Sequence, residues 1–213
     1  MPRLLFLGDS VTDCARKRAR RYQGTPAALG KGWVHHLDKS LVARYGDLQC
    51  WNRGFSGCLI ADLMNQPDWW PGQGEGKPEA MELTTLLIGI NDIWHPFWHA
   101  SAHHIDRSLA SFRLLLETAQ RHSERLVVCQ PFALPCGEVS APWWPLLASL
   151  SNGQQAICSD LGVHWLPMQE ELLSAAQGKL TDYLIDGVHP TDLGHHWLAG
   201  RWLSFVVDKK LLY

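Results

Sequence analysis

The chain has 213 residues, of which 46% are hydrophobic and 19% charged, and its formal net charge is −2. This composition is typical of a folded globular protein, and the length predicts one domain over residues 1–213 that needs no disulfide or metal to complete its core. The near-neutral charge argues against a nucleic-acid partner, and no apolar run approaches the roughly 20 residues of a membrane span.

Short apolar runs alternate with helical patterns along the chain. The first run, at residues 3–8, is shorter than the roughly 7–15 residues of a secretory signal core and predicts a strand instead. Further strands are expected at residues 48–52, 82–89, 125–130 and 163–166, and helices at residues 33–45, 59–64, 101–122, 144–161 and 191–208. This alternation predicts an α/β fold with a five-stranded parallel sheet and helices on both faces.

Two long connections, at residues 67–80 and 131–142, interrupt this pattern. The pair Trp69-Trp70 lies in the first and the pair Trp143-Trp144 borders the second, which suggests lids or a subunit surface. A homo-oligomer is therefore one expectation. The six cysteines are scattered without metal-binding spacing, which favours free thiols and a cytoplasmic protein, although Cys129 and Cys136 are close enough in sequence to pair.

Polar and glycine-containing segments follow the expected strands. They read GDS at 8–10, NRGFSG at 52–57, GIND at 89–92 and, before the last helix, DGVHP at 186–190. Because ligands bind at the carboxyl ends of the strands in parallel sheets, we expect these four segments to meet at one site.

The four segments contain every group that acyl transfer requires. Ser10 is the expected nucleophile, His189 the base that takes its proton, and Asp186 the acid that orients the imidazole. The backbone N–H groups of Ser10 and Gly54 and the side-chain amide of Asn91 are the expected donors to the oxyanion.

The blocks GDS, N-x-G-x-S-G, G-x-N-D and D-x-x-H-P, in this order, resemble the SGNH (GDSL-type) hydrolase superfamily. The resemblance spans residues 8–190 and implies a flavodoxin-like three-layer fold that needs no metal and no organic cofactor. It also implies Ser10, Gly54, Asn91 and His189 as family landmarks, with Asp186 completing the triad.

A narrower resemblance concerns the substrate. The stretches LLFLGDSVTDCARKR, ALGKGWV, GINDIW and DGVHPTDLGHHWLA are similar to bacterial esterases that deacetylate xylan-type saccharides, whereas PWWPLLASLSNG departs from that pattern. The expected partner is thus a small-molecule ester, such as an acetylated oligosaccharide. Trp94 is an expected substrate contact, which either stacks on a sugar ring or forms a wall of the pocket. Asp9 is expected either to contact the substrate as well or to brace Ser10.

Several residues compete for these roles. Ser56 lacks the G-x-S-x-G context of a nucleophile and is expected to cap a helix, while Asp192 and His195 lie inside the expected last helix. The series His95, His99 and His103 has metal-like spacing but contains Pro96, which favours a solvated or packed face. The glycine-rich stretch 72–78 follows no strand and does not match a phosphate loop.

The leading hypothesis is a hydrolase for short acyl esters. The alternatives are a lysophospholipase or thioesterase, with an apolar channel formed by residues 142–150, and a non-catalytic carbohydrate- or lipid-binding module. A nucleotide-binding protein would require a glycine-rich loop after the first strand, and the sequence there, LGDSVTD, has one glycine and two acids.

Overall fold

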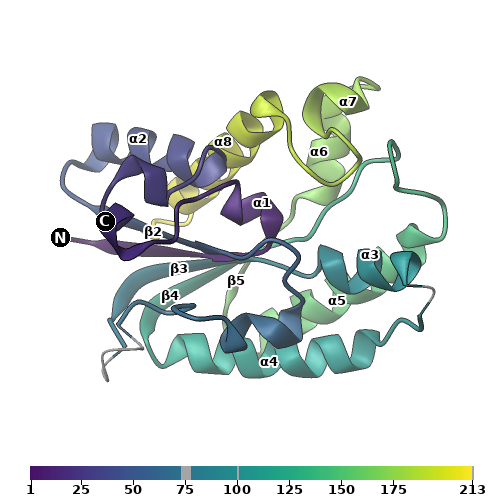
Figure 1. The fold of residues 1–213 in the computed structure, drawn as a ribbon, viewed down its shortest axis with the longest axis horizontal. Coiled ribbons are helices and arrows are strands. Elements are labelled where there is room, and N and C mark those ends of the chain that lie inside the picture. Colours follow the sequence, from purple (N-terminus) through teal and green to yellow (C-terminus); the bar gives the residue numbers. More distant parts are fainter. Residues whose placement is uncertain (73–77, 100, 213) are drawn as a thin grey trace.

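Five parallel strands form the central sheet of the computed structural model, in the order β2-β1-β3-β4-β5 (Figure 1). The strands are β1 (Arg3–Gly8), β2 (Gln49–Gly54), β3 (Met81–Leu87), β4 (Ser123–Cys129) and β5 (His164–Leu166). The structure describes residues 1–72, 78–99 and 101–212. The predicted five-stranded α/β sandwich is confirmed, and this strand order is that of flavodoxin-like folds.

Helices cover both faces of the sheet (Figure 1). One layer contains α2 (Trp33–Tyr45), α6 (Gln169–Ala176) and α8 (Asp192–Asp208), and the other contains α3 (Ile90–Trp98), α4 (Ile105–Gln120) and α5 (Trp143–Asp160). The short helices are α1 (Ser10–Asp13) and α7 (Leu180–Tyr183), with 3-10 turns η1 (Arg20–Tyr22), η2 (Pro26–Ala28) and η3 (Ile60–Asn65).

The two core clusters follow from the alternation of side chains along each strand. In β1, Leu4 and Phe6 pack under the α2 and α8 layer, while Leu5 and Leu7 pack under the α4 and α5 layer. All four side chains are fully buried. A strand buried on both faces has no polar positions, which explains the continuous apolar run in the sequence.

The helix at 33–45 has the predicted boundaries, whereas α1, α3, α6 and α7 were not among the expected helices. The GIND segment was expected as a loop, and Pro96 argued against a helix there. In the structure α3 starts at Ile90 and includes Pro96. Burial of Ile90, Ile93 and Trp94 against the core outweighs the hydrogen bond that the proline lacks.

The tryptophan pairs are largely core residues and not lids. Trp69, Trp70 and Trp143 are at most 4% exposed and belong to the core cluster between the sheet and α4. Residues 143–150, expected as part of an apolar channel, lie in α5, where Leu147 and Leu150 are buried in the same cluster. The phosphate-loop-like stretch falls mainly on residues 73–77, outside the described residues.

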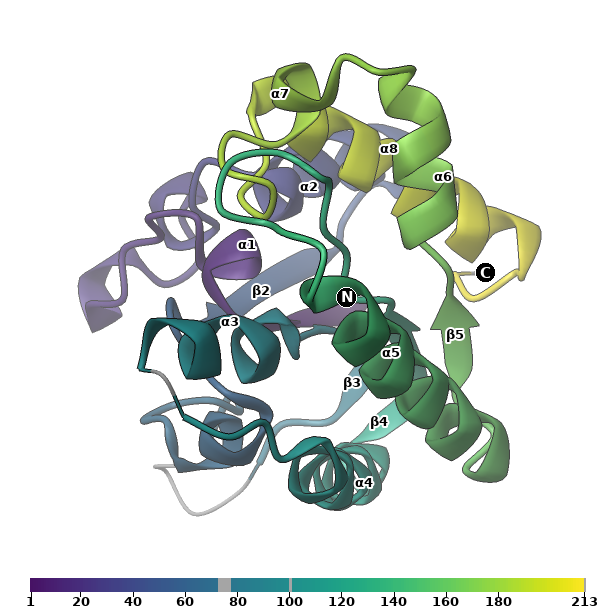
Figure 2. The same cartoon turned by 90° about the vertical axis from the view of Figure 1, so that its right-hand side faces the viewer.

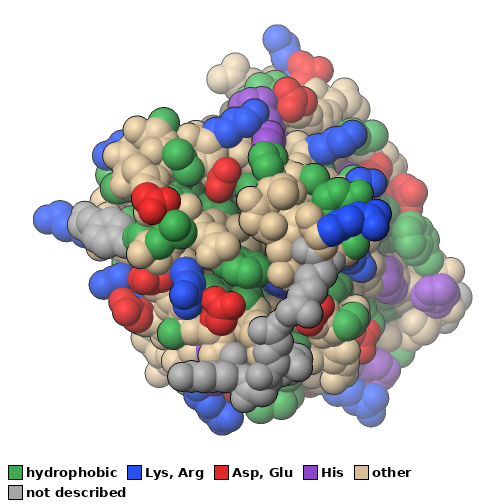
Figure 3. All heavy atoms as spheres, turned by 60° about the vertical axis from the view of Figure 1, so that its left-hand side comes forward, with side chains coloured by type: hydrophobic (Ala, Val, Ile, Leu, Met, Phe, Trp, Pro, Cys, Tyr) green, Lys and Arg blue, Asp and Glu red, His purple; other side chains and the backbone are tan. Residues whose placement is uncertain are grey.

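The surface has no block of one charge on the face seen in Figure 3, where acidic and basic side chains are interspersed. All six cysteines are free, so Cys129 and Cys136 do not pair. Across residues 1–72, 78–99 and 101–212, no helix has both the length and the apolar character needed to cross a bilayer.

Candidate active site

Three of the predicted strand-end segments meet because the strands are in register at their carboxyl ends. Gly8 at the end of β1 pairs with Gly54 on β2 and with Leu87 on β3. The chain therefore leaves all three strands at one level, and Ser10 begins α1 directly above this edge. Figure 2 shows α1 between α3 and the segment that leads into α8.

Ser10, His189 and Asp186 form one hydrogen-bonded chain. Ser10 Oγ lies 2.9 Å from His189 Nε2, and His189 Nδ1 lies 2.6 Å from Asp186 Oδ2. The imidazole is therefore held between the hydroxyl and the carboxylate by both of its nitrogens. This arrangement allows the ring to take the hydroxyl proton at Nε2 while Nδ1–H donates to the carboxylate.

The Asp186 carboxylate also fixes the backbone of the loop that carries His189. Asp186 Oδ1 accepts the backbone N–H groups of Val188 and His189 at 2.9 and 2.8 Å, and Ile185 N–H donates to the His189 carbonyl. Partial burial raises the pKa of Asp186, but the hydrogen bonds from His189 and Val188 outweigh it, so the pKa lies below its ordinary value. Asp186 is therefore ionised at neutral pH.

The connection at 131–142 braces this loop and does not act as a separate lid. Leu134 N–H donates to the Gly187 carbonyl at 2.9 Å, and Glu138 N–H donates to the Asp186 carbonyl at 3.0 Å. Gly137 has a φ of +60°, and a Cβ there would overlap the Asp186 backbone. The close approach of the two loops therefore requires glycine at this position.

Asp9 caps α1 and is not placed to contact a substrate. Its Oδ1 accepts Val11 N–H at 3.0 Å, and the residue is only 1% exposed. Burial raises the pKa of Asp9 from 3.8 to about 7. Of the two expectations for Asp9, the geometry fits the brace of Ser10 and argues against the substrate contact.

The N-x-G part of the second block is a scaffold. Asn52 is buried, and its amide Nδ2 donates to the carbonyls of Thr12 and Leu29, while its Oδ1 accepts Gly54 N–H at 2.8 Å. A Cβ at Gly54 would overlap the backbone of Asp13. Gly54 is thus required for close packing, and its N–H is already engaged, which argues against the expected role as an oxyanion donor.

Gly57, three residues further along, is exposed to solvent, whereas Gly54 is buried. Among the described residues no acceptor is recorded for its N–H, and a Cβ there would have only His95 Cε1 nearby, at 4.0 Å. Asn91 lies in the first turn of α3, and its Nδ2 donates one hydrogen to the Cys58 carbonyl at 3.1 Å. For its second amide hydrogen no acceptor is recorded within residues 1–72, 78–99 and 101–212. The sequence pattern contained Gly57 but offered no means of choosing between the two glycines.

Asp92 holds the start of α3 in place, as the sequence suggested for a brace. Its Oδ2 accepts Ile60 N–H at 3.1 Å, and its Oδ1 accepts the Ser108 hydroxyl at 2.5 Å. It thereby ties α3 to η3 and to α4. Burial is the largest cause of a raised pKa for Asp92, with the Ser108 and Ile60 hydrogen bonds acting in the opposite direction.

Trp94 is beside the site but is not the exposed sugar platform that the sequence left open. Its ring centroid is 5.4 Å from that of His189, and the residue is 4% exposed. Trp98, one turn further along α3, is 59% exposed and its centroid is 5.0 Å from that of Trp94. Both indole N–H groups donate to Glu138 Oε2, at 3.0 and 2.9 Å. Trp94 is therefore a wall, and Trp98 and Glu138 are functional candidates that sequence reasoning missed.

The competing residues have other roles. Ser56 does not cap a helix: its hydroxyl donates to Asp13 Oδ2 at 2.6 Å, and η3 begins only after Leu59. His195 is buried inside α8, with its Nε2 3.4 Å from Cys14 Sγ and Trp33 N–H donating to its Nδ1.

The histidine series, which starts on α3 at His95 and continues into the connection to α4, does not converge on a point. The rings of His95 and His99 are 6.3 Å apart, while His103 Nε2 lies 3.0 Å from the Ile93 carbonyl and its ring packs on Phe97. The sequence favoured a solvated or a packed face for these histidines, and His103 is packed.

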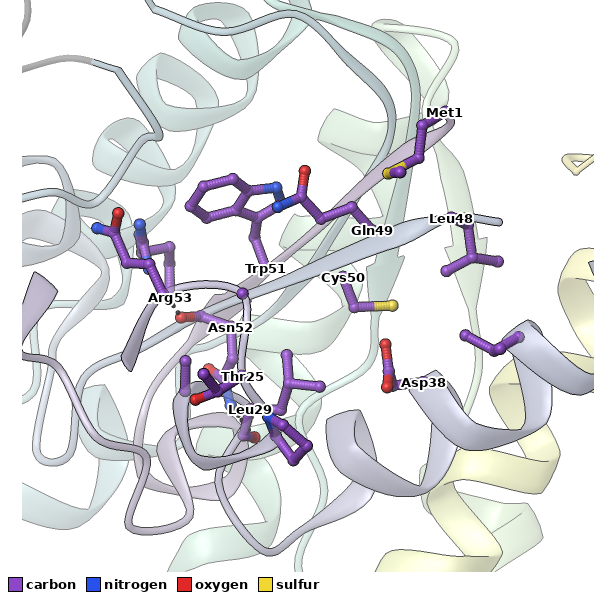
Figure 4. A pocket seen from close by; sticks show the side chains of 15 residues that line it. Met1, Thr25, Leu29, Asp38, Leu48, Gln49, Cys50, Trp51, Asn52 and Arg53 are labelled. Atoms are coloured by element: carbon purple, nitrogen blue, oxygen red, sulfur yellow. Dashed lines mark hydrogen bonds between the residues drawn. The ribbon is translucent and has the colours of Figure 1, made fainter. Parts of the chain in front are cut away.

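A hollow of about 570 Å³ lies over β2 (Figure 4). Its lining includes Asp38, Gln49, Trp51 and Arg53 and none of the triad residues. The Cys50 thiol lies there beside Asp38, but burial raises its pKa well above the ordinary value, so it is not an activated nucleophile. A second hollow of about 510 Å³ lies between α5 and α6 and likewise contains no triad residue. Neither provides the chemistry that the Ser10 site offers.

A serine, a histidine and an aspartate at the carboxyl edge of a parallel α/β sandwich provide the groups that acyl transfer requires. Residues 6–197 match the model of the GDSL-like Lipase/Acylhydrolase family. The chain belongs to this family and is a carboxylic ester hydrolase.

Individual relatives agree with this assignment. An acetylxylan esterase of Geobacillus stearothermophilus is 27% identical over 94% of this chain and 92% of its own length. A crystal structure of an acetylxylan esterase from that organism matches with a TM-score of 0.76, 27% identity and coverage of 95% and 93%. A protein from Parabacteroides merdae described as GDSL-like matches with a TM-score of 0.84, 25% identity and coverage of 99% and 96%. The chain thus resembles acetylxylan-type esterases.

Proposed function

We propose that the chain removes short acyl groups from esters through an acyl-enzyme on Ser10, and that its natural substrate is an acetylated saccharide. The observation that carries the mechanism is the chain of contacts from Ser10 Oγ through the His189 ring to Asp186, at 2.9 and 2.6 Å. Two structures of the Geobacillus stearothermophilus esterase are described as catalytic mutants, with alanine in place of a serine and of an aspartate. We assign a serine and an aspartate, Ser10 and Asp186, to the catalytic site of this chain as well.

In the first half-reaction Ser10 Oγ attacks the ester carbonyl while His189 Nε2 takes the hydroxyl proton. Asp186 stabilises the imidazolium that forms, and its lowered pKa keeps it ionised for this purpose. His189 then gives the proton to the leaving alcohol oxygen, which releases the alcohol and leaves the acyl group on Ser10. Water, activated by the same imidazole, hydrolyses the acyl-enzyme and restores the free hydroxyl.

The negative charge of the tetrahedral intermediate requires donors opposite His189. We assign this role to the backbone N–H groups of Ser10 and Gly57 and to the side-chain amide of Asn91. Gly57 replaces Gly54 in this assignment because the Gly54 N–H already donates to Asn52. All three donors are neutral and fixed by the backbone or by α3, so they need little reorganisation during the reaction.

The saccharide assignment is supported by aromatic side chains next to the triad. Trp94 and Trp98 form a continuous aromatic surface that leads from His189 to solvent, and Glu138 fixes the orientation of both indoles. An exposed, preoriented indole offers a flat apolar surface to the face of a sugar ring. A structural relative is described as an acetyl-xylooligosaccharide esterase.

The experiment is hydrolysis of p-nitrophenyl esters from acetate to decanoate by the wild type and by Ser10→Ala, followed by acetylated xylo-oligosaccharides. We expect kcat/KM to fall steeply beyond butyrate and activity to vanish in the variant, which should fold normally. A preference for octanoate or longer chains would support a lysophospholipase or thioesterase instead. Full activity in Ser10→Ala would refute the assigned nucleophile.

A further inference from the structure

Three potential metal ligands converge on the outer surface where α2 packs against α8. Asp192 and His196 are four residues apart on α8 and so share one face of that helix, and His36 faces them from α2. One ligand atom from each residue can be chosen so that all three lie within 4.8 Å of one another. Figure 1 shows α2 and α8 in the same layer. Among residues 1–72, 78–99 and 101–212 this is the one such group of three.

The spacing of the ligand atoms suits a metal ion better than a direct contact. His36 Nε2 lies 3.6 Å from Asp192 Oδ1, which is too long for a hydrogen bond. Two ligands of a tetrahedral zinc ion, each bonded at about 2.0–2.1 Å, are about 3.4 Å apart. An ion placed between the imidazole and the carboxylate would therefore require only small movements.

A second observation points to a missing ligand at His36. Its Nε2 is buried and is one of the described side-chain nitrogens without a hydrogen-bond partner, although the side chain as a whole is 17% exposed. A buried acceptor or donor without a partner is unfavourable, and a bound cation would supply the partner. Burial, followed by the neighbouring His196, lowers the pKa of His36, which favours the neutral ring that binds metals.

His196 Nδ1 lies near Asp192, 3.5 Å from its Oδ2. Its Nδ1 lies 2.8 Å from the Asp192 carbonyl oxygen, so Nδ1–H donates to the backbone and the Nε2 lone pair remains free. Metal-binding histidines commonly use the second ring nitrogen in this way, which fixes the tautomer. The ring centroids of His36 and His196 are 3.8 Å apart and their planes are inclined by 31°, so the rings are partly stacked and ion binding requires the exposed His196 ring to turn away from His36.

We propose that His36, Asp192 and His196 bind one divalent transition-metal ion, with zinc as the natural candidate, as a clasp between α2 and the first turn of α8. Two imidazoles and one carboxylate favour zinc and its neighbours over calcium or magnesium, which prefer oxygen ligands. The clasp is separate from the acyl-transfer chemistry and is independent of the proposed function. Asp192 lies three residues after His189, so the bound ion would hold the end of the loop that carries His189 against α2.

The test is zinc binding by the full chain, without an affinity tag and after treatment with a chelator. Isothermal titration calorimetry with zinc chloride should show one saturable site. At a free zinc concentration about 100 times Kd, the unfolding midpoint should rise by about 5–10 °C. Cobalt(II) in place of zinc should give the intense visible absorption of a four-coordinate site.

The matched variants are His36→Ala and His196→Ala, with His104→Ala as the control because His104 is an exposed histidine at the start of α4. Each ligand variant should weaken zinc binding by about 100-fold or more, beyond the 10–100-fold typical of outer-shell changes, and abolish the thermal shift. The control should bind as the wild type does. His196 is exposed, so its variant should fold, which circular dichroism checks. Binding that is absent in the wild type, or unchanged in both ligand variants, would overturn the proposal.

Discussion

Replacing Asp186 with asparagine tests the orienting carboxylate with little disturbance of its loop. In the wild type, Oδ1 holds the backbone of Val188 and His189, and Oδ2 accepts the hydrogen on His189 Nδ1. The asparagine oxygen can keep the two backbone hydrogen bonds, which places the NH₂ group opposite Nδ1. That arrangement moves the ring hydrogen to Nε2, where the imidazole cannot accept the Ser10 proton.

The expected loss is about 10⁴-fold in kcat, as for the wrong tautomer in other serine hydrolases, which corresponds to about 5.4 kcal/mol of activation free energy. The free energy of unfolding should change by less than about 1 kcal/mol because the loop keeps its hydrogen bonds. Asp186→Ala should lose the same activity and, in addition, about 1–3 kcal/mol of stability, since two backbone donors lose their acceptor.

The measurements are kcat on p-nitrophenyl acetate and urea unfolding for the wild type and both variants. The depressed pKa of Asp186 also predicts stability that is present above its ordinary pKa of 3.8 and is lost as the pH falls through the folded value. That acid-dependent loss should be smaller in both variants. An Asp186→Asn enzyme within tenfold of the wild-type kcat would refute the reasoning about the tautomer.

Four further substitutions test other parts of the site. Asn91→Ala should lower kcat by about 10²–10³-fold with little change in KM, and an effect confined to KM would exclude an oxyanion role. Trp98→Ala should raise KM for acetylated xylo-oligosaccharides by about 2–12-fold without affecting p-nitrophenyl acetate, and equal effects on both would argue against a sugar platform. Gly54→Ala should cost about 3 kcal/mol of stability, measured by urea unfolding, because its Cβ overlaps the Asp13 backbone, and a neutral result would contradict the packing argument. Since the pKa of Asp9 rises from 3.8 unfolded to about 7 folded, ionisation favours the unfolded state as the pH rises through this range. Asp9→Asn should therefore lose less thermal stability than the wild type between about pH 4 and pH 7, and parallel melting curves for the two proteins would contradict this.

The sequence was most informative about elements whose apolar spacing matches their final burial. The helix at 33–45 has the predicted boundaries because Val34, Leu37 and Leu41 recur at helical spacing and all three are buried. The missed helix α3 shows the limit of such patterns. Pro96 is unfavourable within an isolated helix, but burial of Ile93 and Trp94 against the core decides the local conformation.

The sequence by itself determined which functional groups follow which elements: a serine follows the first strand, an amide follows the third, and an acid–histidine pair precedes the last helix. Strands of a parallel sheet must end at a common edge, so these groups had to be brought close together. Only the tertiary structure decided how single atoms are engaged. Whether the N–H of Gly54 or of Gly57 is free depends on the Asn52 side chain, which is held by the distant Thr12 and Leu29. The same holds for Glu138 beneath the two indoles and for His36 facing α8, because these contacts join segments far apart in the chain that no local pattern relates.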